Sequence, residues 1–320
     1  MSDEARRSAV AVAILTHNRP DELALLLESL RGQSAPLHSV VVVDNGTQRL
    51  DMSPFESDLE INHILSDSNL GGAGGFSLAI LSALTTTADW VWVMDDDACP
   101  EDASCLGTLL SEAHERDLSA VSPIIVAPED DTMLSFPFRV DGKLSYDRAA
   151  VTRTPFWPDA ALLFNGLLIR REAIFEIGLP DLKLFIRGDE VDYLLRLRKS
   201  GLKFGTATAA AFTHPTGWAE VNSIVKGRYH ILIPETDFKR YYFFRNRGYL
   251  IRRHVRPVSL FVDVIGYATH YLVKKRDVAG FRRWFGAFRT GLRSDFSGPD
   301  GSDVSPPEGR RSRKATHGPG

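Results

Sequence analysis

Three consecutive aspartates, Asp95, Asp96 and Asp97, directly follow the apolar segment DWVWVM, which is typical of a buried strand. Like charges a few ångströms apart at a strand end repel one another unless a cation compensates them. Carboxylate oxygens suit Mg2+ or Mn2+, and both ions commonly bridge a carboxylate to a substrate diphosphate. The run therefore predicts a divalent-metal site, although an acidic run alone is also typical of a solvated loop.

A second acidic pair, Asp189 and Glu190, begins a predicted helix whose apolar face is Val191, Leu194, Leu195 and Leu197. Two carboxylates in a first helical turn can simply complement the helix dipole. One of them can also act as a general base that takes a proton from a hydroxyl nucleophile. Because a metal can neutralise a departing diphosphate, one base would suffice for such a displacement.

His214 lies in the segment AFTHPTGW, after a further apolar run. A lone histidine is more often a structural hydrogen-bonding group than a ligand. Imidazole nevertheless pairs well with carboxylates around Mn2+, so a metal-ligand role beside the aspartates is the alternative.

The segment SNLGGAGGFSLAI contains Asn69 and four glycines, Gly71, Gly72, Gly74 and Gly75, ahead of a predicted helix. Glycines let a backbone approach a ligand closely, and the amides at a helix start attract anions. The segment lacks the Gly-Lys-Ser/Thr ending of a Walker loop and does not follow the first strand, as a dinucleotide fingerprint would. A flexible turn is the alternative interpretation.

Alternating strands and helices from the N-terminus predict an α/β fold with a doubly wound, mostly parallel sheet flanked by helices. In such a sheet the ligand lies at the carboxyl ends of the strands. Polar or glycine residues follow four predicted strands, at Thr16 to Arg19, Asp44 to Gly46, Asn69 to Gly75 and Asp95 to Asp97.

The charge is uneven along the chain. The net charge is −3, yet residues 239–293 hold 14 Lys or Arg against two acids, and residues 1–238 carry a net −15. This basic, aromatic helical segment predicts contact with phosphates or an anionic membrane surface, with a solvated helical face as the alternative. The stretch from Arg256 to Lys274 is short and polar for a spanning helix, which favours an interfacial helix.

We therefore predict a catalytic domain over 1–225, a helical acceptor or membrane-association segment over 226–293, and a disordered tail over 294–320. No recognised nucleic-acid motif accompanies the basic segment, so no nucleic-acid partner is expected. The start of the sequence lacks the pattern of a signal peptide, and a cytoplasmic location at the inner face of the membrane is expected. A homo-oligomer is left open.

The motifs THNRP, VVDNG, NLGGAGGF, WVMDDDA, FNGLLIRR, FIRGDEVDY and THPTGW, in this order, resemble family-2 glycosyltransferases. Within that family, NLGGAGGF, LFIRGDEV and RNRGY resemble the galactofuranosyltransferases that initiate galactan synthesis in mycobacteria and their relatives. The resemblance runs from about residue 10 to residue 293. It implies the GT-A fold, an inverting transfer and a role in cell-wall arabinogalactan biogenesis.

The resemblance also implies ligands and residue roles. The donor would be UDP-galactofuranose, and the acceptor a rhamnosyl-N-acetylglucosamine on a polyprenyl diphosphate. A divalent ion, Mn2+ or Mg2+, would bind Asp95, Asp97 and His214, and Glu190 would be the base with Asp189 beside it. Nucleotide-sugar contacts would come from Thr16, Asn18, Arg19, Asp44, Asn69, Gly71, Gly72, Gly74, Gly75, Asp95 and Asp96.

Related galactofuranosyltransferases often carry two aspartates where this chain has Asp189 and Glu190. A glutamate reaches about one methylene further, so which of the two is the base stays open. Two alternative functions also remain at this point: a rhamnosyltransferase that uses dTDP-rhamnose on a lipid-linked acceptor, and a non-catalytic scaffold of a cell-wall complex.

Overall fold

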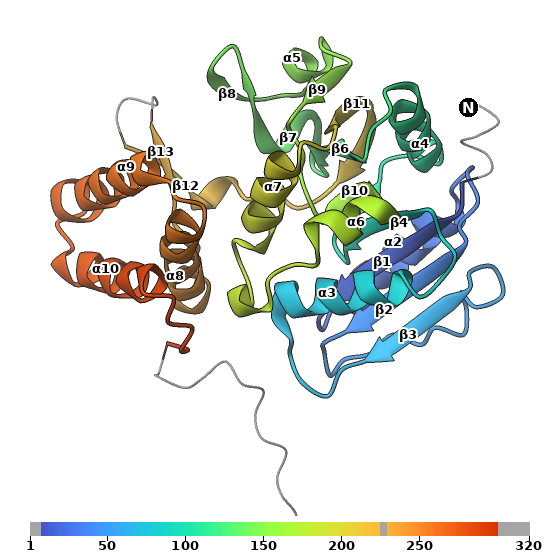
Figure 1. Cartoon of the computed structure of the whole chain (residues 1–320), viewed down its shortest axis with the longest axis horizontal. Helices are drawn as coiled ribbons and strands as arrows, with labels where there is room; N and C mark the ends of the chain where they lie inside the picture. The colour runs from blue at the N-terminus through green and yellow to red at the C-terminus, as the bar shows by residue number, and fades with distance from the viewer. Residues whose placement is uncertain (1–7, 225–228, 300–320) are drawn as a thin grey trace, which may run out of the picture.

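The computed structural model describes residues 8–224 and 229–299. Its centre is a twisted sheet that begins with four parallel strands in the order β3-β2-β1-β4 (Figure 1). These are β1 (Val10–Thr16), β2 (Ser39–Asp44), β3 (Ile61–Leu65) and β4 (Trp90–Asp95). Every residue of β1 and β2 is buried, as the continuous apolar runs predict for strands covered on both faces.

Helices cover both faces of this sheet, which confirms the doubly wound fold expected from the sequence. Val10, Val12 and Ile14 of β1 pack on one face against α2 (Pro20–Arg31) and α4 (Cys105–Glu115). Ala11, Ala13 and Leu15 pack on the other face against α3 (Gly71–Ala83), and α6 (Arg171–Ile177) and α7 (Asp189–Ser200) lie on the same side. The alternation follows from the period of two along a strand.

The sheet continues beyond β4 with mixed polarity. Strand β10 is antiparallel to both of its neighbours, β4 and β6, and β11 runs parallel to β6. A small layer of short elements covers the far end. The bounds are β5 (Cys99–Pro100), β6 (Ala120–Ala127), β7 (Asp130–Val140), β8 (Lys143–Asp147), α5 (Arg148–Thr152), β9 (Phe156–Pro158), β10 (Asn165–Arg170), η1 (Leu182–Leu184) and β11 (Phe204–Thr213).

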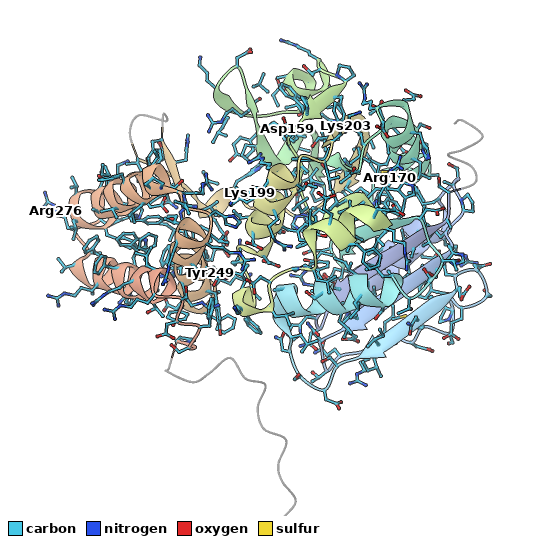
Figure 2. All side chains as sticks on the ribbon, in the orientation of Figure 1. Asp159, Arg170, Lys199, Lys203, Tyr249 and Arg276 are labelled. Carbon is cyan, nitrogen blue, oxygen red and sulfur yellow. The ribbon has the colours of Figure 1, made fainter. Side chains whose placement is uncertain are left out.

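The C-terminal helices form a separate layer beside the sheet (Figure 1). They enclose an apolar cluster of their own, centred on Trp284, Phe288, Phe244 and Tyr267. Figure 2 shows Tyr249 on the side of this layer that faces the rest of the molecule, where its hydroxyl donates to Asp181 at 2.9 Å. The bounds are η2 (Trp218–Glu220), β12 (Val221–Ser223), β13 (His230–Leu232), α8 (Asp237–Arg253), α9 (Pro257–Ala268), η3 (Thr269–Lys274, a π-helix) and α10 (Val278–Leu292).

The predicted boundary between residues 225 and 226 lies outside the described residues, between the paired strands β12 and β13. The predicted disordered tail, 294–320, is described only to residue 299. In that part, Phe296 packs edge-on against Tyr249, and Ser297 accepts a hydrogen bond from Tyr241 at 2.8 Å. No helix within the described residues is both long and apolar enough to cross a bilayer.

Helices α8 and α10 pack closely enough that glycine is required at their crossing. A Cβ at Gly291 would lie 1.7 Å from the Arg245 carbonyl oxygen, and a Cβ at Gly248 would lie 2.2 Å from that of Phe288. Because these neighbours are backbone atoms, neither clash can be relieved by rotating a side chain.

We expect Gly291→Ala to lower the free energy of unfolding by about 3 kcal/mol, because the helices must separate to admit the methyl group. Gly286→Ala in the same helix is the matched control, since Gly286 is exposed and a Cβ there meets nothing within 4 Å. The control should stabilise the protein by about 0.5–1 kcal/mol through helix propensity. Thermal unfolding measures both; equal melting temperatures for the two variants would show that the crossing is not tight.

Candidate active site

The three aspartates lie at the carboxyl end of β4, where the sheet fold places ligands. One carboxylate oxygen from each of Asp95, Asp96 and Asp97 lies within 4.8 Å of the others. Burial, followed by the negative charges of the other two aspartates, raises the pKa of Asp95 well above its usual range. The cluster is therefore short of positive charge in the chain alone.

Asp96 is held by partners from the end of β1. It accepts hydrogen bonds from the Thr16 hydroxyl at 2.8 Å and from the His17 amide at 3.3 Å, and Arg19 pairs with it at 2.9 Å. Arg19 also contacts Asp97. The structure thus places Thr16 and Arg19, predicted to contact the nucleotide, as partners of the acidic cluster.

Asp97 and His214 face one another across the site. His214 Nε2 lies 3.2 Å from Asp97 Oδ1, while His214 Nδ1 donates to the Pro215 carbonyl oxygen at 2.6 Å. Burial opposes protonation of His214, but the close contact with Asp97 and its negative charge outweigh burial and raise the histidine pKa. For Asp97, burial alone would raise the pKa, but the contacts with His214 and Arg19 outweigh burial and lower it.

These donor atoms fit a divalent cation. Asp97 Oδ1 is buried and has no hydrogen-bond donor with suitable geometry, although His214 Nε2 lies near it. Buried polar atoms without a partner are uncommon and call for an explanation such as an ion. Two carboxylates and one imidazole are ligands that Mn2+ accepts, and Mg2+ accepts the oxygens. Asp96 accepts more hydrogen bonds from the chain than Asp95 does, and metal binding by Asp95, Asp97 and His214 stays a prediction.

The second acidic pair begins α7, directly after Gly188. Asp189 is buried, and burial raises its pKa to about 6, against the hydrogen bonds that it accepts from the amides of Asp189 and Glu190. Glu190 is exposed. Desolvation by the surrounding protein, and then the charge of Asp189, raises the pKa of Glu190 to about 7.

The two acidic groups belong to one site. The charge of His214 lowers the pKa of Glu190, and Glu190 in turn raises that of His214, so the base candidate and the metal-ligand candidate interact. The backbone near Asp189 also meets the start of α3: the Ala73 amide donates to the Phe185 carbonyl at 2.9 Å. Residues from β1, β4, α3, α7 and β11 therefore converge on one place.

The glycine-rich segment forms the first turn of α3, because the helix begins at Gly71. The expected glycine turn ahead of the helix is therefore wrong. A Cβ at Gly71 would lie 2.3 Å from the Phe185 carbonyl oxygen, and one at Gly75 would lie 2.2 Å from Leu15. At Gly74 the nearest atom would be Leu70 Cβ, at 2.8 Å, and at Gly72 it would be Asp189 Oδ2, at 3.2 Å. Close packing within the chain accounts for these glycines, and contact with a donor stays a prediction.

Three other residues predicted to contact the nucleotide sugar lie at neighbouring strand ends, and each accepts hydrogen bonds from nearby backbone amides. Asn18 Oδ1 accepts from the amides of Thr47 and Gln48, at 2.6 and 2.9 Å. Asp44 is buried and accepts from the Gly46 amide at 2.8 Å, and Asn69 accepts from the Gly71 amide at 2.8 Å. These contacts hold the loops that follow the strands, and nucleotide binding by the three residues stays a prediction.

Two features of the site were missed by reasoning from residue types. Arg187, just before the acidic pair, forms a bidentate ion pair with Glu220 at 2.8 and 3.0 Å. Arg245 and Asn246 of α8 bond to the loop that precedes Asp189. The motif RNRGY contains Arg245 and Asn246, but the motif alone does not show which loop these side chains contact.

Comparison with known proteins decides the family. The model of glycosyl transferase family 2 matches residues 11–177, which is more than half of the chain. The chain belongs to glycosyltransferase family 2. This glycosyltransferase is 40% identical over 301 residues to the galactofuranosyltransferase GlfT1 of Mycobacterium tuberculosis, covering 92% of this chain and 99% of the relative. It is 38% identical to GlfT1 of Mycolicibacterium smegmatis, with 90% and 97% coverage. The family resemblance expected from the motifs is confirmed.

Solved structures agree with the fold. A structure of GalNAc-T7 with UDP, GalNAc and Mn2+ has a TM-score of 0.55 at 14% identity, covering 88% of this chain and 55% of that one. Residues 1–349 of TarS from S. aureus give a TM-score of 0.54 at 13% identity, with 90% and 82% coverage. At such identities the likeness supports the GT-A fold alone.

We expect Mn2+ to stabilise the wild-type chain and Asp97→Asn to abolish most of this effect, because one ligand is lost. At a metal concentration of 100 times Kd, binding adds about 2.7 kcal/mol, which raises the melting temperature measurably. Asp141→Asn, at an exposed position in the turn between β7 and β8, is the control and should keep the full shift in melting temperature. A Mn2+ shift that survives Asp97→Asn unchanged would place the ion elsewhere.

Proposed function

We propose that this glycosyltransferase moves galactofuranose from UDP-galactofuranose to a rhamnosyl-N-acetylglucosamine on a polyprenyl diphosphate, with inversion, at the inner face of the cell membrane. The observation that carries the proposal is the convergence of Asp95, Asp97 and His214, whose charge also acts on Glu190. Its choice of sugar rests on the relatives named galactofuranosyltransferase, which match nearly the whole chain.

On the donor side, Asp95, Asp97 and His214 would hold a divalent ion. The ion would supply positive charge to the diphosphate of the donor and to the leaving nucleotide. Arg19 lies against the same carboxylates and adds a second positive charge there. Leaving-group protonation is then unnecessary, and a single protein base is enough for the reaction.

On the acceptor side, Glu190 is the better base of the acidic pair. Asp189 is buried and accepts hydrogen bonds from the first amides of α7, so its carboxylate is committed to the helix start. Glu190 is open to solvent, and its pKa is raised to about 7, which matches a group that must take up a proton near neutral pH.

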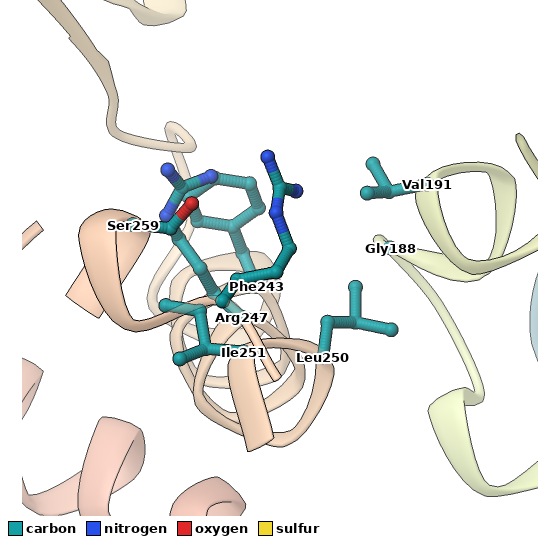
Figure 3. A pocket seen from close by; sticks show the side chains of 8 residues that line it. Gly188, Val191, Phe243, Arg247, Leu250, Ile251 and Ser259 are labelled. Carbon is teal, nitrogen blue, oxygen red and sulfur yellow. The ribbon is translucent and has the colours of Figure 1, made fainter. Parts of the chain in front are cut away.

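A pocket beside this base suits the acceptor. Gly188 and Val191, which flank the acidic pair, form one wall, and Phe243, Arg247 and Ile251 of α8 with Ser259 of α9 form the opposite wall (Figure 3). Arg247 pairs with the buried Asp263, whereas Arg256, which also lines the pocket, pairs with no carboxylate among the described residues. The Arg256 guanidinium beside apolar side chains would suit a phosphorylated lipid-linked sugar.

The outer face of α9 suits a membrane surface. Val258, Phe261, Val262 and Ile265 are exposed at helical spacing, with Phe261 70% exposed. Lys274, Lys275 and Arg276 follow this apolar stripe, and Figure 2 shows Arg276 at the outer end of the C-terminal layer. An apolar stripe with basic residues at its end binds anionic bilayers by partial insertion and charge attraction.

We expect Glu190→Gln to lower the turnover of galactofuranose transfer by about 10²–10⁴-fold, because the amide cannot accept the hydroxyl proton. Affinity for UDP in the presence of Mn2+ should stay within about twofold, since the metal ligands are intact. Glu60→Gln, on the loop before β3, is the control and should leave turnover unchanged. A Glu190→Gln variant within a few-fold of wild type would refute the base assignment.

We expect the protein to co-sediment with vesicles that contain anionic lipid, and binding to weaken as salt screens the basic residues. Phe261→Asp should reduce the bound fraction several-fold, because a charge replaces an inserting aromatic ring. Phe175→Asp is the matched control, since Phe175 is 68% exposed on α6, in the catalytic domain. Equal losses for the two variants would argue against α9 as the contact surface.

A further inference from the structure

The loop that leads into the acidic pair has an unusual backbone. Phe185, Arg187 and Gly188 have φ angles of 62°, 63° and 99°, so three of four consecutive residues are left-handed. Non-glycine residues seldom adopt this conformation, and it persists only where the surroundings hold it. The loop ends at the first residue of α7, so its conformation sets where Asp189 and Glu190 lie.

Asn246 of α8 holds this loop through its side-chain amide. The Nδ2 group lies 2.7 Å from the Leu184 carbonyl oxygen, 2.9 Å from that of Ile186 and 2.6 Å from that of Arg187. Its two N–H groups are shared among three acceptors on the loop. Asn246 is completely buried, so no water can replace these donors without a rearrangement.

Arg245 fixes the orientation of that amide. Its Nε and Nη2 atoms donate to Asn246 Oδ1 at 3.0 and 2.9 Å, so the asparagine oxygen faces the guanidinium and its nitrogen faces the loop. Arg245 also donates to the carbonyls of Lys183 and Leu184. It is completely buried, and no carboxylate pairs with it in the part of the chain that the structure describes. The Arg245 guanidinium therefore donates its hydrogen bonds to backbone carbonyl oxygens and to Asn246 Oδ1.

The same loop also contacts the start of α3, because the Phe185 carbonyl accepts from the Ala73 amide. Phe185 packs against Tyr242, one turn before Asn246, with ring centroids 5.1 Å apart. Helix α8 therefore contacts the loop in two ways: Asn246 donates to the loop carbonyls, and Tyr242 packs against the Phe185 ring.

We propose that Asn246 is a positioning residue, which holds residues 184–188 so that Glu190 faces the acceptor hydroxyl. The proposal rests on the proposed function, in which Glu190 is the base. An amide is required at this position, because a carboxylate or an aliphatic group cannot donate to the three carbonyls. The C-terminal helices thereby take part in catalysis through a residue that need not touch any substrate.

The test compares Asn246→Asp with wild type. Aspartate keeps the shape and the acceptor for Arg245 but removes both donors to the loop. We expect turnover to fall by about 10²-fold, the loss typical of a slightly misplaced catalytic group. The donor KM and the UDP affinity with Mn2+ should stay within about threefold. Hydrogen exchange should rise at the amides of residues 184–192 and remain unchanged in β1 and β4.

Phe288→Leu is the matched control, because it loosens the core of the same helical layer without touching the loop. At a comparable loss of melting temperature it should keep turnover within about threefold and leave exchange at 184–192 unchanged. The proposal is overturned if Asn246→Asp retains wild-type turnover, if it leaves that exchange unchanged, or if Phe288→Leu reproduces both effects. Wild-type protein that turns over no UDP-galactofuranose would refute the proposed function instead, and the exchange measurement would still decide the role of Asn246.

Discussion

Electrostatic repulsion among three carboxylates at the end of β4 is the constraint around which this molecule is arranged. Neighbouring side chains compensate part of this repulsion: Thr16 and Arg19 contact Asp96, and His214 lies beside Asp97. The raised pKa of Asp95, whose first cause is burial, and the buried Asp97 Oδ1, which accepts no well-aligned hydrogen bond, indicate that the compensation is incomplete. A bound cation would complete it, and the same cation would be placed to receive a departing diphosphate.

The sequence predicted the first half of the sheet well, because its signals are local. Continuous valine runs indicate strands buried on both faces, and Leu23, Leu26, Leu27 and Leu30 recur at helical spacing in α2. Polar residues after each strand then had to meet at one sheet edge. Thr16, Asp95 and Asp97 do meet there, and Asp189 and Glu190 reach it from α7.

Local sequence signals could not predict the second half of the sheet or the contacts between distant segments. The antiparallel insertion of β10 between β4 and β6 depends on pairings far apart in sequence, which no periodicity encodes. The four glycines predicted a turn ahead of a helix, whereas the helix α3 already begins at Gly71 and packs closely on Leu15 and the Phe185 carbonyl. Asn246 lies in a basic, aromatic stretch that predicted surface contacts, whereas its side chain is buried against the loop that leads into Asp189 and Glu190.

The most direct test of the account is the mass of the products formed from a synthetic lipid-linked rhamnosyl-N-acetylglucosamine and a panel of nucleotide sugars. The account predicts a galactofuranosyl product from UDP-galactofuranose only, which is lost with a chelator and restored by Mn2+ or Mg2+. Transfer of rhamnose from dTDP-rhamnose, transfer that ignores the chelator, or no transfer from any donor would contradict it.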